Sequence, residues 1–238
     1  MTEFRPSRFE ILPVIIKNLL IINGLFFLAQ ITFPESPTAN FSLEDLFALH
    51  AWQSDLFKPW QLLTHLFMHG DFYHILGNMF ALWMFGSVLE NLWGSARFLT
   101  FYLVCGLGAA LIHLLFLNYE LTPLIEEFQT REKLGLINEA VAFKYNQIIN
   151  TATLGASGAV FGILAAFVYL FPNTYIYLYF FVPVKAKWVG LIYFAFEIYS
   201  AVQNAAGDNV ARWAHVGGAL VGLIIVITWN KTNKKTFY

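Results

Sequence analysis

The chain has 238 residues, of which 58% are hydrophobic and only 12% are charged, whereas soluble domains carry about 25% charged residues. This composition indicates an integral membrane protein and leaves no room for a separate soluble domain. The net charge of −1 excludes the strongly basic balance of nucleic-acid-binding proteins, so we expect no nucleic-acid partner. The single cysteine, Cys105, excludes an intrachain disulfide.

Six segments are long and apolar enough to cross a bilayer, which takes roughly 20 mostly apolar residues. In chain order they are 11–32, 72–92, 97–117, 152–171, 186–203 and 212–229. They predict an all-α polytopic membrane protein, a bundle of six transmembrane helices. We expect a cytoplasmic N-terminal segment (1–10), a membrane domain (11–229) and a cytoplasmic C-terminal tail (230–238). No cleavage site follows the first segment, which is therefore expected to remain as a helix.

Two connections between these segments are long. The first, about 33–71, is rich in aromatic residues, and the third-to-fourth connection, about 118–150, is polar. The aromatic run from Tyr175 to Phe181, together with Trp188, is expected to anchor the chain at the membrane interface.

The distribution of Lys and Arg predicts the orientation, because cytoplasmic loops carry an excess of these residues. If the N-terminus is cytoplasmic, nine of them lie inside and five outside. The inner set is Arg5, Arg8, Lys17, Arg97, Lys185, Lys187, Lys231, Lys234 and Lys235, and the outer set is Lys58, Arg131, Lys133, Lys144 and Arg212. We therefore expect both termini inside and both long connections outside.

Three apolar segments begin with polar residues that suit acyl-transfer chemistry. Ser157 opens the fourth, His215 the sixth, and His74 and Asn78 the second. In the predicted orientation all three segments run from outside to inside. At 1.5 Å rise per residue these side chains share one layer, roughly 5–10 Å below the outer surface.

A serine hydroxyl becomes a good nucleophile when a base takes its proton, which Ser157 and His215 can achieve only if their helices approach closely. Each helix carries a pair of glycines four residues apart, Gly158 with Gly162 and Gly218 with Gly222. Such pairs allow close approach, although ordinary helix packing is the alternative explanation of either pair alone.

Donors for a developing oxyanion are also present. His74 and Asn78 are four residues apart and so lie on one helix face, and Ser157 lies near a helix N-terminus with free amide groups. No acidic residue is obviously placed to orient His215, which favours a Ser–His dyad over a triad. Phe161, one turn after Ser157, is expected to hold the imidazole by stacking.

Other polar residues have more than one interpretation or none. His65 and His69 could form a zinc site, but the chain has no HExxH motif, and a structural role in the first connection is favoured. Glu197 lies well inside the fifth segment, where a water-facing or gating role and a role in helix packing are both open. His113 has no visible partner and is assigned no role.

These residues resemble the rhomboid family of intramembrane serine proteases, bacterial type, over about 11–229. The family motifs are HxxxN (74–78), GxSG (155–158) and AHxxG (214–218), in this order on alternate helices. The resemblance implies that Ser157 is the nucleophile and His215 the general base, with an oxyanion hole from His74, Asn78 and the Ser157 amide. Supporting residues are Phe161, Gly155, Gly158 and Gly218.

The resemblance further implies that no cofactor or metal is needed. It implies single-pass transmembrane proteins as substrates, cut near the outer end of their helix, and a location in the bacterial inner membrane. A rhomboid-like protein that only binds and escorts membrane proteins is the main alternative, but it would not need Ser157 and His215 together. A small transporter would show internal pseudo-symmetry, which the segments lack.

The chain departs from common family patterns at three places. Trp60-Gln61 stands where many rhomboids have Trp-Arg, which leaves the anchoring of the first connection open. Arg212 replaces the first His of AHxAH, and Phe161 replaces a Tyr found in some members. Glu90 resembles a family glutamate that bonds loop backbone, although a solvated helix terminus explains it equally well.

Overall fold

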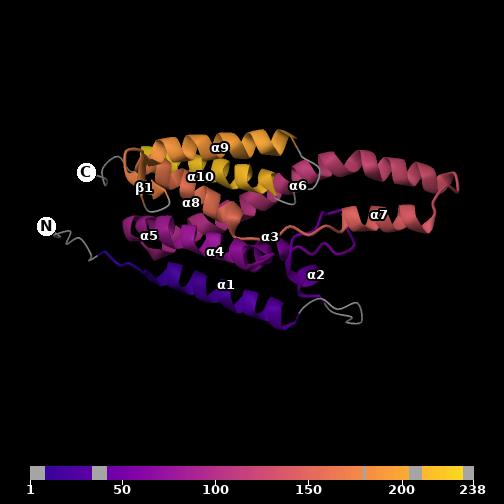
Figure 1. Cartoon of the computed structure of the whole chain (residues 1–238), viewed down its shortest axis with the longest axis horizontal. Coiled ribbons are helices and arrows are strands. Elements are labelled where there is room, and N and C mark those ends of the chain that lie inside the picture. The colour runs from indigo at the N-terminus through magenta and orange to yellow at the C-terminus, as the bar shows by residue number, and fades with distance from the viewer. Residues whose placement is uncertain (1–8, 34–41, 179–180, 204–210, 233–238) are drawn as a thin grey trace.

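The computed structural model describes residues 9–33, 42–178, 181–203 and 211–232. Within these ranges the chain forms a bundle of helices with one small β-hairpin (Figure 1). The predicted terminal segments, 1–10 and 230–238, fall largely outside the described residues. The expected all-α membrane bundle is confirmed.

Each of the six predicted segments coincides with a helix or a continuous run of helical residues. These are α1 (Val14–Thr32), α4 (Phe72–Ala81) continued by η2 (Leu82–Gly86) and α5 (Ser87–Trp93), α6 (Ser95–Lys133), α8 (Ser157–Leu170), α9 (Ala186–Gln203) and α10 (Arg212–Thr232). Of the described helices, α1, the α4–α5 run, α6 and α10 are long and apolar enough to cross a membrane. The apolar helix α8 is shorter, and α9 contains Lys187 and Glu197.

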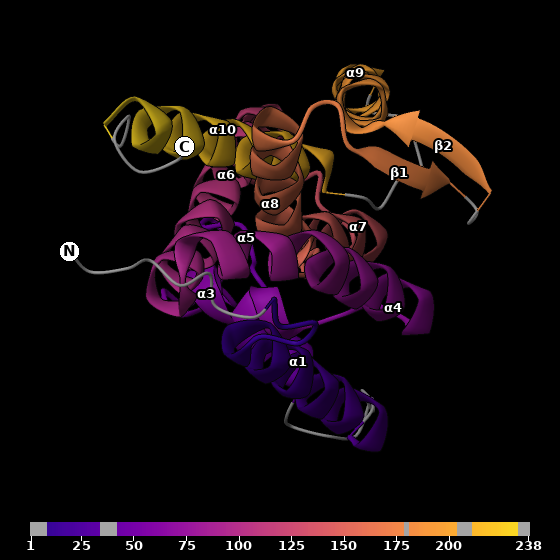
Figure 2. The same cartoon turned by 90° about the vertical axis from the view of Figure 1, so that its left-hand side faces the viewer.

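Helix α8 is the centre of the bundle, and Figure 2 shows it surrounded by its neighbours in an end-on view. All residues from 158 to 167 are buried. The helix begins later than the predicted segment 152–171, because residues 152–156 are not helical. Their backbone bonds to the first connection: Thr153 and Leu49 exchange hydrogen bonds of 2.7 and 2.8 Å, and the Gly155 N–H donates to the His65 carbonyl at 2.9 Å. Non-helical backbone is tolerated at membrane depth when protein satisfies its polar groups in this way.

The glycine pairs bring α8 and α10 into backbone contact. A β carbon on Gly218 would overlap the carbonyl oxygen of Gly158, and one on Gly222 would lie 2.6 Å from the carbonyl oxygen of Gly162. A residue larger than glycine would fit at neither position unless one of the helices moved. The expected close approach of the fourth and sixth segments is therefore confirmed.

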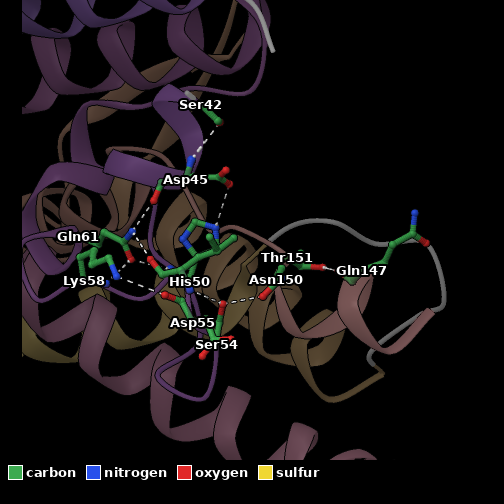
Figure 3. Close-up of polar contacts among 11 residues, drawn as sticks. Ser42, Asp45, His50, Ser54, Asp55, Lys58, Gln61, Gln147, Asn150 and Thr151 are labelled. Carbon is green, nitrogen blue, oxygen red and sulfur yellow. Dashed lines mark hydrogen bonds and ion pairs between the residues drawn. The ribbon is translucent and has the colours of Figure 1, made fainter. Parts of the chain in front are cut away.

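The first connection folds into α2 (Leu43–Phe47), α3 (Gln61–Thr64) and η1 (His65–Phe67), held together by the fully buried side chain of Gln61. Its Oε1 accepts from the N–H groups of His50 and Lys58, at 3.3 and 3.1 Å (Figure 3). Its Nε2 donates to the carbonyls of Asp45 and Leu56, at 2.8 and 3.0 Å. Gln61 thus anchors the connection at the position where many rhomboids carry Arg.

The connection between the third and fourth segments is a helical hairpin. Helix α6 continues to Lys133, and α7 (Glu139–Ile149) returns beside it, beyond the end of the bundle (Figure 1). At 39 residues α6 is about 58 Å long, roughly twice the hydrocarbon thickness of a bilayer. Phe128 stacks on Tyr145 at 3.9 Å between ring centroids, and Asn138 caps α7 by accepting the Val141 N–H.

The aromatic run predicted to anchor at the interface forms part of a β-hairpin. Strand β1 (Tyr175–Leu178) pairs antiparallel with β2 (Val182–Lys185), and the hairpin extends sideways next to α9 (Figure 2). Tyr175 and Tyr177 are exposed, as a membrane-interface position requires. The hairpin is peripheral, so it does not change the all-α class of the bundle.

Glu90 is buried and bonds the backbone of α1. Its two carboxylate oxygens each accept an N–H from the first turn of that helix, Ile15 and Ile16, at 2.9 Å. Ser95 donates a third hydrogen bond at 2.7 Å. Pro13 offers α1 no side-chain cap, so Glu90 caps the helix from a distance. The solvated-terminus interpretation of Glu90 is wrong, and the backbone that it bonds belongs to α1.

Candidate active site

Ser157 is the first residue of α8, at the point where the non-helical segment 152–156 ends. The preceding residue, Ala156, provides no side-chain cap for the helix. Because the first N–H groups of a helix have no acceptor within it, the start of α8 is suited to binding an anion. The serine and an anion-binding element therefore coincide.

The hydroxyl of Ser157 lies 2.8 Å from Nε2 of His215. The two residues are 58 positions apart in the chain and come together because α8 and α10 contact each other through their glycines. His215 is 9% exposed and is largely shielded by the bundle, whereas Ser157 is half-buried. This is a hydrogen-bond distance at which a proton can move from the serine to the imidazole.

Phe161 stacks on the imidazole of His215. The ring centroids are 4.2 Å apart and the planes differ by 9°. Tyr193 of α9 contacts the other side of this cluster, with its ring centroid 5.1 Å from that of Phe161. The predicted stacking is present, and it fixes the plane of the imidazole.

The expectation that no acidic residue orients His215 is wrong. Oε2 of Glu197 lies 3.1 Å from Nδ1 of His215, on the opposite side of the ring from Ser157. The same oxygen lies 3.4 Å from Nη1 of Arg212, and Glu197 is only 4% exposed. The site therefore contains an ordered line of serine, histidine and carboxylate, with an arginine beside the carboxylate.

Chain connectivity carried a signal that would have found Glu197. Helices α9 and α10 are consecutive, so residues at similar distances from their connection lie at similar depth. Glu197 lies six residues before the end of α9 at Gln203, and His215 lies three residues after the start of α10 at Arg212. What connectivity does not provide is the rotation of each helix about its axis, which turns both side chains toward each other.

The partners of His215 define its tautomer. A carboxylate only accepts hydrogen bonds, so Nδ1 carries the proton that points to Glu197. In the neutral ring Nε2 is then free of hydrogen and accepts from the hydroxyl of Ser157. This is the protonation state required of a general base that activates a serine.

His74 faces the same site from α4. The N–H of Gly70 donates to Nδ1 of His74 at 3.3 Å, so the neutral ring carries its hydrogen on Nε2. Asp71 accepts the backbone N–H of His74 at 2.9 Å and caps the start of α4. The backbone at the start of α4 thus sets the ring to donate from Nε2.

Gly155 separates His74 from Ser157. A β carbon at this position would lie 2.8 Å from Nε2 of His74 and 3.5 Å from Oγ of Ser157, so both side chains border the same glycine. The residue also has φ of +126°, which other residues rarely adopt. Glycine at 155 therefore allows both the turn into α8 and the approach of His74 to the serine.

Asn78 lies one turn after His74 on α4 and is 7% exposed. Its Nδ2 group has no hydrogen-bond partner within the described part of the chain. An unpaired buried donor costs free energy, so such groups often mark a position where a ligand binds. Nδ2 of Asn78 is therefore a buried donor that no described residue uses.

Two further histidines, His65 and His113, bond neighbouring residues near the site. His65 bonds the Gln61 carbonyl through Nδ1 at 2.8 Å, as expected of a residue that shapes the first connection. His113, for which the sequence suggests no partner, has one, because its Nε2 lies 2.8 Å from the hydroxyl of Thr153. Among the described residues, no group of three or more His, Cys, Asp or Glu side chains is arranged to hold a metal ion.

Known proteins resemble this chain in sequence. A family model described as the Rhomboid domain matches residues 56–231. Rhomboid protein 1, mitochondrial, of Saccharomyces cerevisiae is 30% identical over 68% of this chain and 40% of its own length. RHOMBOID-like protein 12, mitochondrial, of Arabidopsis thaliana is 29% identical over 74% of this chain and 47% of its own length. Rhomboid protease AarA of Providencia stuartii is 26% identical over 89% of this chain and 71% of its own length. The chain thus spans less than half the length of the first two of these relatives.

Proposed function

The chain belongs to the rhomboid family, since the Rhomboid domain model matches most of it, and we propose that it is an intramembrane serine endopeptidase. The observation that carries this proposal is the 2.8 Å contact between Oγ of Ser157 and Nε2 of His215 inside an apolar bundle. The name of one relative, Rhomboid protease AarA, supports the same activity.

The reaction begins when Oγ of Ser157 attacks the carbonyl carbon of the scissile peptide bond. Nε2 of His215 takes the hydroxyl proton, and the negative charge that develops on the carbonyl oxygen is stabilised by His74, Asn78 and the Ser157 amide. The imidazolium of His215 then protonates the leaving amine. Water, deprotonated by the same histidine, hydrolyses the acyl-enzyme and restores Ser157. Apart from the substrate and water, each step uses groups of this chain, and no cofactor takes part.

The substrates that we propose are single-pass transmembrane proteins. A helical peptide bond is shielded by its own hydrogen bonds, so a substrate helix must unwind before Ser157 can reach a carbonyl carbon. Small residues near the scissile bond and helix breakers beyond it favour this unwinding. We expect cleavage near the outer end of the substrate helix, at the depth of Ser157.

We further propose that the membrane domain covers 11–229, with both termini in the cytoplasm and the site open to the outer side. The outer end of the bundle would then hold the first connection and the α6–α7 hairpin (Figure 1). A bacterial inner membrane is the proposed location. The matched relatives come both from bacteria and from organisms with mitochondrial rhomboids.

Cleavage of a defined substrate tests the proposed activity. Purified protein in detergent is incubated with a single-pass membrane substrate that carries small residues at the outer end of its helix. We expect cleavage by the natural chain and none by Ser157→Ala or His215→Ala. Cleavage that survives both substitutions but stops with a chelator would instead indicate a metal-dependent protease.

A further inference from the structure

Glu197 approaches the catalytic histidine from a different helix than its other partners. Its Oε2 is 3.1 Å from Nδ1 of His215, while Ser157 is bonded to Nε2. Ser157 and Phe161 belong to α8, whereas Glu197 belongs to α9. The imidazole of His215 is thus held between two helices, with one hydrogen-bond partner at each nitrogen.

Burial of a carboxylate at this position costs free energy, and apolar packing does not offset that cost. Glu197 is 4% exposed, and a buried charge in an apolar bundle is expensive unless it is paired. Arg212 supplies a counter-charge at 3.4 Å and lies over the ring of Phe196. Arg212 alone would be a sufficient partner for a structural ion pair, yet the shorter contact of Glu197 is with His215.

The stacked ring and the carboxylate restrain different motions of the imidazole. Phe161 fixes the plane of the ring, but a ring stacked at 4.2 Å can still rotate within that plane. A hydrogen bond from Nδ1 to a fixed carboxylate stops this rotation and also selects the tautomer. Only the second restraint guarantees that an unprotonated Nε2 points to the hydroxyl of Ser157.

On the basis of the proposed protease function, we propose that Glu197 is a positioning residue that acts through His215, completing a Ser157–His215–Glu197 triad. The carboxylate of Glu197 accepts Nδ1–H of His215 throughout the reaction. When the proton of Ser157 moves to Nε2, the imidazolium that forms is stabilised by the negative charge 3.1 Å away. Arg212 keeps that carboxylate in place, and His215 later gives the Nε2 proton to the leaving amine.

Other charged or titratable groups act on His215 and are kept constant in the test. His74 of α4 and His113 of α6 both interact electrostatically with His215. Ser157 faces it from α8, and Arg212 lies one turn before it on α10. A substitution of Glu197 alone leaves these groups unchanged.

The test compares the pH dependence of substrate cleavage for the natural chain and Glu197→Gln, which keeps the size of the side chain and removes its charge. We expect kcat to fall by about 100-fold with little change in KM, within the roughly 10⁴-fold loss seen when a serine protease triad loses its carboxylate. The acidic limb of kcat/KM should move to lower pH, because the imidazolium of His215 loses a stabilising charge.

Glu90→Gln is the matched control, because Glu90 is also a buried carboxylate but caps α1 away from the site. Glu90→Gln should lower the melting temperature and leave the pH of the acidic limb of kcat/KM unchanged. A second control, Glu197→Asp, keeps the charge and should restore part of the lost kcat. If Glu197→Gln lowers only the melting temperature, with kcat and the limb unchanged, Glu197 is merely structural and the positioning role is wrong.

A measurement on the natural chain covers the case in which Glu197→Gln does not fold. The protein is labelled with ¹⁵N-histidine and studied by proton and ¹⁵N NMR, and the His215 signal is assigned by its absence in His215→Asn. We expect a downfield Nδ1–H signal from His215 near neutral pH. A hydrogen on Nε2 instead would overturn the positioning role. The two proposals can fail separately. If the natural chain shows no Ser157-dependent cleavage, the proposed protease function is wrong. If Glu197→Gln cleaves the substrate as well as the natural chain does, only the proposed triad is wrong.

Discussion

Each atom of the His215 imidazole that matters for catalysis has its own contact. Nε2 meets the hydroxyl of Ser157 at 2.8 Å, Nδ1 meets Glu197 at 3.1 Å, and the face of the ring lies on Phe161. A base that is held in this way loses little conformational entropy on reaching the transition state. In the proposed mechanism, His215 is therefore held in position before any substrate binds.

The unpaired amide of Asn78 leads to a prediction about catalysis. Asn78→Ala should lower kcat by about 10²–10³-fold with KM nearly unchanged, because this donor gains its partner only as the oxyanion forms. Steady-state cleavage kinetics measure both constants. Asn23→Ala is the control, since Asn23 is a buried asparagine of α1 that bonds the Leu19 carbonyl. Equal kcat values for Asn78→Ala and the natural chain would show that Asn78 does not stabilise the oxyanion.

At the scale of elements, the distance between α8 and α10 sets the distance between Ser157 and His215. We predict that Gly218→Ala separates the two helices, because its β carbon would overlap the Gly158 carbonyl oxygen. Overpacking of this kind costs about 1–3 kcal/mol of stability, and the separated Ser157 and His215 should lose most activity. Melting temperature and cleavage rate are the two measurements.

Gly24→Ala is the matched control for that substitution, because a β carbon on Gly24 of α1 would have open space around it. It should keep the cleavage rate and gain slightly in helix propensity. If Gly218→Ala were as active as Gly24→Ala, close approach of α8 and α10 would not control the site.

The first connection gives a prediction about pH and stability. Burial lowers the pKa of His65 and of His69 from the usual 6.5 to about 4. At His65 the hydrogen bond to the Gln61 carbonyl opposes the shift, and at His69 the neighbouring His74 adds to it. The unfolded chain therefore binds more protons than the folded chain between about pH 6.5 and 4. The stability from these neutral histidines is complete above pH 6.5 and is lost as the pH falls toward 4.

Melting temperatures in detergent between pH 7.5 and 4.5 measure this effect. We expect the melting temperature to fall progressively below pH 6.5. Relative to each protein's own value at pH 7.5, the fall should be smaller in His65→Gln than in the natural chain. His65 lies outside the reacting groups and bonds the Gln61 carbonyl, so some loss of stability at every pH is expected. The same slope in both proteins would show that His65 does not become protonated on unfolding.

At the scale of the whole molecule, α1 begins and α10 ends at the same end of the bundle (Figure 1). The starts of α4, α8 and α10 lie toward the other end, which brings His74, Ser157 and His215 to one level. The proposed site therefore lies toward one end of the bundle and would face one side of a membrane. Which side this is follows from the distribution of Lys and Arg, and it remains a prediction.

Cysteine labelling tests the orientation, and the chain suits it because its one cysteine, Cys105, is fully buried. Lys133→Cys, at the end of α6, should react with a membrane-impermeant maleimide added to intact spheroplasts. Lys231→Cys, near the end of α10, should react only after the membrane is permeabilised. The reverse pattern would place the site on the cytoplasmic side.

Much of this arrangement could be predicted from the sequence, because hydropathy locates helices and motif spacing locates Ser157, His215 and Asn78. The contact of Glu197 with His215 could not, since it depends on how α9 and α10 are rotated about their axes. The anchoring of the first connection by Gln61 depends on backbone groups that no pattern of side chains indicates. The non-helical start before α8 was hidden by the apolar character of its residues.

The most direct test of the central claim is the site of reaction with a fluorophosphonate, which modifies activated serines. The protein is treated in membranes, digested, and mapped by mass spectrometry, with His215→Ala as the comparison. We predict one adduct, on Ser157, and a strong decrease in His215→Ala because the base is missing. An unmodified Ser157 in the natural chain, or equal modification in His215→Ala, would contradict the account.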